Sequence, residues 1–121
     1  MSRVVRASEM KRSGESAGVA TPSLGADESV VCHVRSAPNW TGKPHSHDRE
    51  EIILALVGSG AVTLDGETTP FGAGDAIIIS AGTLHQLEAG GDGMECITVE
   101  PVGTRFFDPD GQEHPVPDLM L

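Results

Sequence analysis

Two histidines separated by a single residue, His45 and His47, stand out because the chain contains only five histidines. Side chains at positions i and i+2 of an extended segment point to the same face. Glu51 keeps that parity if no bulge intervenes, so three potential metal ligands face one side of the segment. Taken alone, the two histidines could equally be solvated loop residues, with Glu51 closing the start of a strand.

A fourth potential ligand, His85, opens a short segment after a turn of small residues at 81–83. Antiparallel pairing can bring it opposite His47. Three imidazoles and one carboxylate suit a divalent first-row transition ion, namely Fe, Mn, Ni, Co, Cu or Zn. Four protein ligands in octahedral geometry leave two positions open, and open positions distinguish a catalytic metal from a structural one. We therefore predict one such ion, and its predicted ligands are His45, His47, Glu51 and His85.

Short β-prone segments must position these ligands. The expected strands are residues 29–35, 51–57, 61–64, 67–71, 75–80, 84–88, 94–100 and 104–107. Glycines at 58–60 and 90–93 are interpreted as turns, and Asp65-Gly66 is a strong signal for a two-residue hairpin. The apolar run at 51–57 is short and bracketed by turn residues, which favours a strand over a helix. Many short strands without an amphipathic helix predict an all-β sandwich or barrel.

The segments around the ligands resemble the two sequence motifs of the cupin superfamily. In the first, PHSHDREEIILALVG at 44–58, the matching residues are His45, His47, Glu51 and Gly58. In the second, GDAIIISAGTLH at 74–85, they are Gly74, Gly82 and His85. Asn39, Ser80 and Ala89 stand where the motifs have glycine, proline and asparagine. These three positions serve turn or strand geometry, so the departures leave the ligand set intact.

The resemblance covers about residues 29–103 and implies an all-β cupin-type jelly-roll β-barrel, also called a double-stranded β-helix. It also implies a homodimer, often with an N-terminal arm exchanged between subunits. We divide the chain accordingly into an arm at 1–28, a barrel at 29–107 and a tail at 108–121. His114 lies in that proline-rich tail and is expected to be solvated.

Strand parity after Glu51 makes a further prediction about which side chains enter the barrel. Ile53 follows Glu51 inward, whereas Ile52, Leu54 and Leu56 face outward. An outward apolar stripe needs cover from a second sheet layer or from a partner subunit, and we predict a homodimer.

Four residues outside the ligand set are candidates for binding a substrate: His33, Arg35, Trp40 and Ile53. His33 and Arg35 share one face of their strand, and they could contact an anionic or carbonyl substrate if that face points inward. Outward exposure of both is the favoured alternative. Trp40 could wall the pocket entrance or serve packing alone. Aliphatic lining at Ile53 indicates a compact or aromatic organic molecule rather than a sugar.

Composition excludes several classes of function. Eighteen acidic residues against 8 basic ones give a formal net charge of −10, which disfavours nucleic acid as a partner. The sequence contains no run of 18 or more apolar residues, so no membrane span is predicted. The first ten residues lack the apolar stretch of a secretory signal. These features predict a cytoplasmic protein. Cys32 and Cys96 are accordingly expected to be buried thiols rather than a disulfide.

Three classes of function remain. A metal-dependent oxygenase of the dioxygenase type, acting on a small organic substrate, is favoured narrowly. The second is a non-redox isomerase, lyase or cyclase in which the metal acts as a Lewis acid. Such an enzyme needs an acid/base group, and the chain has no tyrosine to supply it. His33 or Glu95 would have to serve, or Glu51 would leave the metal and act as the base. Of these, we name Glu51 as the catalytic candidate. The third is a module that binds or senses a small molecule without transforming it.

Overall fold

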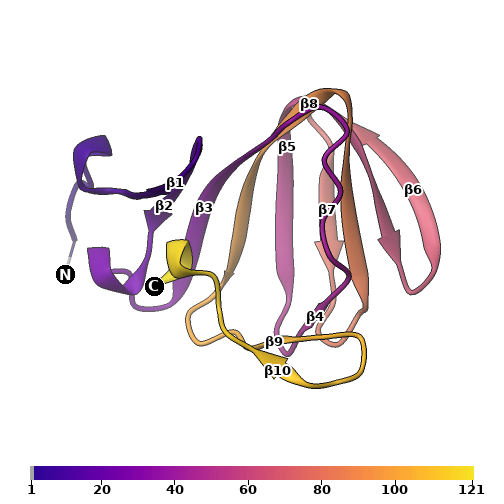
Figure 1. Ribbon diagram of the computed structural model, residues 1–121. Coiled ribbons are helices and arrows are strands. Elements are labelled where there is room, and N and C mark those ends of the chain that lie inside the picture. The colour runs from indigo at the N-terminus through magenta and orange to yellow at the C-terminus, as the bar shows by residue number, and fades with distance from the viewer. Residues whose placement is uncertain (1) are drawn as a thin grey trace.

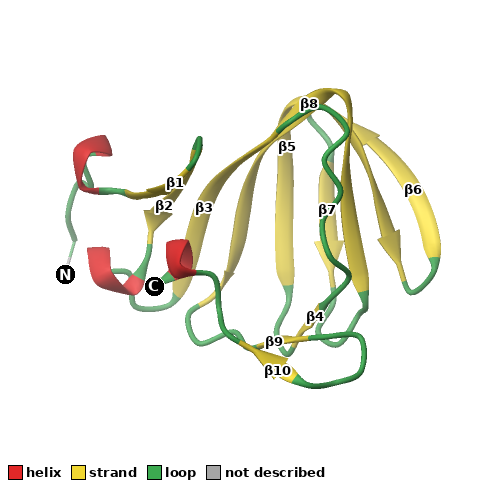
Figure 2. Cartoon of the chain, viewed as in Figure 1, coloured by secondary structure: helices red, strands yellow, loops and turns green. Residues whose placement is uncertain are grey.

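Two antiparallel sheets make up the computed structural model, which describes residues 2–121 (Figures 1 and 2). Their strands are β1 (Lys11–Ser13), β2 (Ser16–Ala20), β3 (Ser29–Ser36), β4 (Ser46–His47), β5 (Glu51–Leu64), β6 (Glu67–Gly72), β7 (Ala76–Ile79), β8 (His85–Pro101), β9 (Phe106–Phe107) and β10 (Glu113–His114). Three short 3-10 turns, at Ala7–Glu9, Pro22–Leu24 and Asp118–Met120, complete the regular structure. The predicted all-β class is confirmed. Within residues 2–121, no helix is long and apolar enough to cross a membrane.

The larger sheet has the strand order β1-β2-β3-β8-β5-β6, and β7 pairs with β5. The smaller sheet has the order β10-β9-β4 and lies across one end of the barrel that the long strands form (Figure 1). This arrangement is the jelly-roll that the resemblance to cupins implies. Because β4 carries His47, the smaller sheet closes the end of the barrel at which the predicted ligands gather.

The strands β5 and β8 are longer than predicted, because the glycine-rich segments at 58–60 and 90–93 do not turn the chain. Instead, the register between β5 and β8 shifts near Gly58, where a bulge interrupts the ladder. Gly58 has a φ of +81°, and a Cβ there would collide with the carbonyl oxygen of Gly93. Glycine therefore allows a bulge that bends a continuous strand around the barrel, and the expected turns at these two places are wrong.

The hairpin at Asp65-Gly66 is confirmed. It joins β5 to β6, and both turn residues have positive φ, 47° for Asp65 and 88° for Gly66. A type I′ turn requires these angles.

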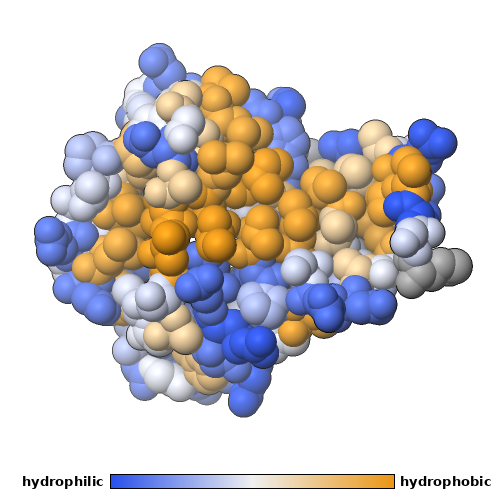
Figure 3. Space-filling model, turned by 180° about the vertical axis from the view of Figure 1, so that it is seen from behind, coloured by the Kyte–Doolittle hydropathy of each residue, from blue (hydrophilic) through white to orange (hydrophobic). Residues whose placement is uncertain are grey.

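Burial along β5 follows the predicted parity. Glu51, Ile53 and Ala55 are buried, while Ile52, Leu54 and Leu56 are each 40% exposed. Seen from behind, apolar side chains form a continuous band across the molecule (Figure 3).

Both ends of the chain pack against the barrel. In the 1–28 segment, β2 extends the larger sheet by pairing with β3. In the tail, Met120 is buried in a second core cluster with Val30, Cys32 and Phe106. Cys32 and Cys96 are both buried free thiols, as expected.

Candidate metal centre

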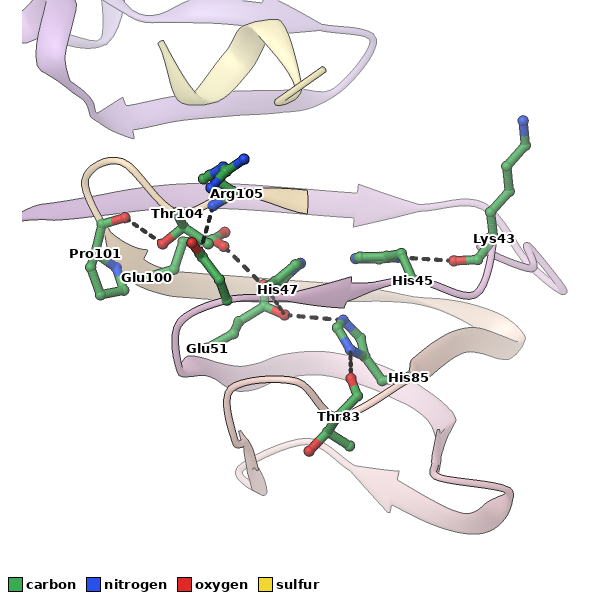
Figure 4. Close-up of polar contacts among 11 residues, drawn as sticks. Lys43, His45, His47, Glu51, Thr83, His85, Glu100, Pro101, Thr104 and Arg105 are labelled. Atoms are coloured by element: carbon green, nitrogen blue, oxygen red, sulfur yellow. Dashed lines mark hydrogen bonds and ion pairs between the residues drawn. The ribbon is translucent and has the colours of Figure 1, made fainter. Parts of the chain in front are cut away.

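Backbone pairing brings the three motif histidines together. The backbone N–H of His45 donates to the carbonyl of His85 over 3.0 Å, and the N–H of His85 donates back over 2.9 Å. The carbonyl of His47 accepts from Gly82 N–H over 2.7 Å, which fixes the turn before His85. The ring centroids of His45 and His85 are consequently 4.3 Å apart, and those of His45 and His47 are 4.8 Å apart (Figure 4).

Two of these imidazoles are oriented by the backbone. His45 Nδ1 donates to the carbonyl of Lys43 over 3.0 Å, and His85 Nδ1 donates to the carbonyl of Thr83 over 2.9 Å. A carbonyl only accepts, so each Nδ1 carries the proton and each Nε2 keeps its lone pair. This is the arrangement that metal-binding histidines adopt.

Two buried carboxylates face the imidazoles from the barrel interior. Glu51 Oε1 lies 3.7 Å from His85 Nε2 and 3.8 Å from His47 Nδ1. Glu100, from β8, places Oε2 3.5 Å from the same His47 Nδ1. The three histidines form one group of potential ligand atoms, and His47 also belongs to a second group with Glu51 and Glu100.

The protonation states favour a cation at this cluster. Burial lowers the pKa of His47 to about 3 and lowers the pKa of His45 and His85, so the imidazoles are neutral at neutral pH. Burial raises the pKa of Glu51 and of Glu100, and the charge of Glu100 raises that of Glu51 further. A bound divalent ion would stabilise the ionised carboxylates and use the free lone pairs.

Unpartnered polar atoms supply a direct test of this fit. Within residues 2–121, the buried side-chain nitrogens and oxygens without a hydrogen-bond partner are His47 Nδ1 and Nε2, His85 Nε2 and Glu100 Oε2. Buried polar atoms are rarely left unpaired because desolvation is costly. All four lie in the cluster, so this group of histidine and glutamate side chains can bind a metal ion.

A pocket of about 440 Å³ opens beside His45. Its lining residues include Trp40, Lys43, Leu87, Phe106, Asp108 and His114. His114 arrives through the register of the smaller sheet, in which it pairs with Phe106, and Phe106 in turn pairs with His47. Its ring lies 6.3 Å from that of His45, and its Nε2 lies 3.6 Å from Asp108 Oδ1.

The predicted substrate-binding residues do not gather at this pocket. Trp40 lines it. His33 and Arg35 instead approach Glu95, at 2.6 Å and 3.3 Å, and neither lines the pocket. Ile53 is fully buried in the core beneath the strands.

Comparison with known proteins gives the family that the two sequence motifs suggested. Residues 32–100 match the sequence profile of the Cupin domain. The chain belongs to the cupin family. This cupin is 40% identical over 57 residues to the dimethylsulfoniopropionate lyase DddW of Ruegeria pomeroyi, a match that covers 47% of this chain and 38% of that protein.

Solved structures share the fold of this cupin over longer stretches. The polyketide cyclase RemF of Streptomyces resistomycificus is 24% identical with a TM-score of 0.74, covering 98% of this chain and 89% of RemF. A salicylate 1,2-dioxygenase of Pseudaminobacter salicylatoxidans is 18% identical with a TM-score of 0.64, covering 70% of this chain and 25% of the enzyme. At these identities the likeness shows a shared cupin fold.

The sequence analysis did not identify two residues, one in the candidate metal centre and one in the pocket beside it. Glu100 ends the strand predicted at 94–100 and has the same parity as Cys96, which was expected to be buried, so an inward carboxylate was readable from the sequence. His114 was expected to be solvated, but it is half-buried and lines the pocket. Its placement depends on two-residue strand pairings, for which the local sequence carries no signal.

Proposed function

We propose that this cupin is a metal-dependent enzyme that catalyses a non-redox elimination or cyclisation on a compact organic substrate. The ion would be held by His45, His47, Glu51 and His85, and when bound it supplies a Lewis acid for a substrate carboxylate or carbonyl oxygen. One observation carries the proposal: the pocket beside the imidazole cluster contains an acid/base pair, His114 and Asp108, that does not belong to the ligand set.

The position of His114 suits proton transfer. Asp108 Oδ1 faces its Nε2. Backbone pairing joins β10 to β9, and Arg105, just before β9, forms an ion pair with Glu113 of β10. A positioned imidazole at a pocket wall can take a proton from a substrate carbon or return one to a leaving group. His114 thus supplies the group that non-redox chemistry requires and that the sequence had assigned to His33, Glu95 or Glu51.

The pocket walls support a compact substrate with an apolar or aromatic body. Trp40, Leu87 and Phe106 provide apolar surface, and Lys43 places one cation among the lining residues. A substrate carboxylate is attracted by such a cation and by an ion at the imidazoles. The names of two similar proteins, a lyase and a cyclase, describe reactions without net oxidation and are consistent with this choice.

Dimethylsulfoniopropionate is the first substrate to test. In its elimination His114 would take the proton α to the carboxylate, the C–S bond would break, and dimethyl sulfide and acrylate would form. We expect metal-loaded protein to release dimethyl sulfide under nitrogen as fast as in air, measured by gas chromatography. His114→Ala should lower kcat by about 10²- to 10⁴-fold without loss of metal, whereas His33→Ala should change neither.

Turnover that requires oxygen would overturn the non-redox proposal. A loss of activity in His114→Ala that is matched in His33→Ala would remove His114 from the acid/base role. If dimethylsulfoniopropionate is recovered unchanged, the same comparison of His114→Ala with His33→Ala applies to a panel of compact carboxylates and β-carbonyl compounds. Recovery of that whole panel unchanged would favour a binding module.

A dioxygenase is the second candidate, because a set of three histidines and one glutamate suits redox-active iron or manganese. Its test is oxygen uptake by protein loaded with Fe²⁺ under anaerobic conditions and then mixed with salicylate and air. Uptake that is stoichiometric with product would support the dioxygenase over the eliminating enzyme.

We further propose that this cupin is a homodimer that buries the outer face of β5 and β7. Exposed apolar side chains gather there, namely Ile52, Leu54, Leu56, Val57 and Ile78. A contiguous apolar face of this kind marks an interface. Residues 1–28 would act as the arm, 29–107 as the barrel and 108–121 as the tail, and an exchanged arm would make the β2–β3 pairing across the dimer. Light scattering should give a dimer that Leu54→Glu dissociates, and a wild-type monomer at micromolar concentration would overturn the proposal.

A further inference from the structure

The second buried carboxylate, Glu100, lies outside both cupin motifs and has no place in the proposed ligand set. It is 4% exposed, on the inner face of β8, where its Cα pairs with that of Val30 on β3. Its Oε2 lies 3.5 Å from His47 Nδ1, and neither atom has a hydrogen-bond partner. A buried carboxylate in this position calls for an explanation.

The three histidines of the cluster differ in what holds their Nδ1 atoms. His45 and His85 each donate Nδ1–H to the carbonyl two residues earlier in the chain. For His47 that carbonyl belongs to His45, and it already accepts the backbone N–H of His85. His47 therefore lacks the backbone acceptor that orients the other two rings. Of the two carboxylates, the nearer to its Nδ1 is Glu100, with Oε2 at 3.5 Å against 3.8 Å for Glu51 Oε1.

Both carboxylates approach His47 Nδ1, but they differ in how many of the cluster histidines they reach. Glu51 Oε1 lies within 4 Å of both His85 Nε2 and His47 Nδ1, so it approaches the side on which a free imidazole lone pair is presented. Among the cluster histidines, Glu100 comes within 4 Å of His47 alone. Glu51 thus reaches two of the predicted ligands, whereas Glu100 reaches His47 alone.

We propose that Glu100 is a positioning residue that accepts a hydrogen bond from His47 Nδ1–H and so directs His47 Nε2 to the metal. The proposal rests on the metal centre of the proposed function. A carboxylate behind a metal-binding imidazole fixes the tautomer and ring orientation and raises the basicity of the ligating nitrogen, which a backbone carbonyl does more weakly. His47 would then be the most strongly donating of the three imidazoles.

The test compares Glu100→Gln with Glu95→Gln, using Zn²⁺ alone as the probe. Both substitutions keep side-chain volume and remove one carboxylate from β8 that faces a histidine, but Glu95 faces His33, outside the cluster. Competition with a chromophoric chelator should show zinc affinity about 10- to 100-fold weaker in Glu100→Gln. Glu95→Gln should match the wild type. Equal zinc affinity in all three proteins would overturn the proposal.

A structural readout separates positioning from ligation and from misfolding. In zinc-loaded protein, nitrogen-15 NMR should show His47 with a protonated Nδ1 and a zinc-bound Nε2. Zinc on Nδ1 of His47 would overturn the proposal. So would the loss of one oxygen ligand in the X-ray absorption spectrum of Glu100→Gln, because Glu100 would then itself be a ligand. Metal-free Glu100→Gln should retain the circular dichroism and cooperative melting of the wild type.

Failure of the metal centre would look different. A wild-type protein whose zinc binding is weak and insensitive to His85→Ala would overturn the proposed function and this inference with it. Tight zinc binding that is lost in His85→Ala but kept in Glu100→Gln would overturn the role of Glu100 alone.

Discussion

Two histidine–glutamate pairs in this cupin have opposite surroundings. His33 and Glu95 approach to 2.6 Å across β3 and β8, with about a quarter of each side chain exposed. Arg35 joins them at 3.3 Å. His47 and Glu100 are 3.5 Å apart, and their side chains are only 2% and 3% exposed. The pair with the shorter contact is the one outside the candidate metal centre.

The difference shows that surroundings, more than distance, mark a site. Glu95 has a guanidinium, an imidazole and partial solvation, so its charge is satisfied without any ligand. The buried pair leaves Glu100 Oε2 and both ring nitrogens of His47 without partners. Burying unpaired polar groups is costly, and a fold that retains them gains most from a bound cation. A close ion pair at the surface carries no such demand.

The largest expected effect is on metal content. His85→Ala removes an imidazole whose Nε2 is free and buried, so zinc or iron affinity should fall by more than the roughly 100-fold that an outer partner typically costs. His33→Ala removes a histidine that lies outside the cluster and is hydrogen-bonded to Glu95, so it should retain stoichiometric metal. Elemental analysis of untagged protein measures both. Full metal content in both His85→Ala and His47→Ala would show that the buried cluster does not bind the metal. The contrast between the two histidine–glutamate pairs would then be wrong.

The sequence identified only one member of the buried inner pair, His47 and Glu100. His47 was found from its spacing to His45, because two residues in an extended segment share a face whatever the tertiary fold. Glu100 lies four residues after Cys96 in the segment predicted as a strand, so strand parity already gave it the face of the expected buried thiol. Its approach to His47 has no signal in the local sequence, because β8 and β4 belong to different sheets.

The outer pair, His33 and Glu95, shows why strand parity alone does not tell which side chains are buried. Alternation correctly placed His33 and Arg35 on one face of β3 and Cys32 on the other. Alternation alone does not say which face meets the core, since both faces carry side chains able to pack, although outward exposure of His33 and Arg35 was the favoured alternative. Burial of Cys32 beside Phe106, a residue 74 positions away in sequence, decides the matter through the closed barrel. Contacts between distant segments also bring in His114, which local pattern could not predict.

The next effect concerns stability of the metal-free protein against pH. Burial raises the pKa of Glu51 to about 8 from a reference of 4.5, so the folded state retains a proton that the unfolded state has lost. The stability from this proton is complete below about pH 4.5 and is lost as pH rises through about 8. The buried histidines act in the opposite direction, but only below about pH 6.5, because their pKa values are lowered.

Between pH 6.5 and 8 the free energy of unfolding should therefore decrease, by at most about 1.4 kcal/mol per pH unit for each proton. Urea unfolding in the presence of a chelator measures this slope. Glu51→Gln should flatten this slope, whereas Glu95→Gln, in the outer pair, should leave the slope unchanged. A stability that rises over this range in the wild type would contradict the buried, protonated state of the inner carboxylates.

The smallest expected effect is the coupling energy of the outer pair. His33 and Glu95 are partly solvated, and Arg35 remains near Glu95 when His33 is removed. A double-mutant cycle with His33→Ala and Glu95→Gln should therefore give about 0.5–1 kcal/mol or less, measured by urea unfolding at pH 6. Adding Zn²⁺ should raise the stability of all four proteins of the cycle equally, because ligand binding adds the same free energy to each folded state. A coupling that changes with Zn²⁺ would mean that the outer pair senses the metal centre, and the division between the two pairs would then be wrong.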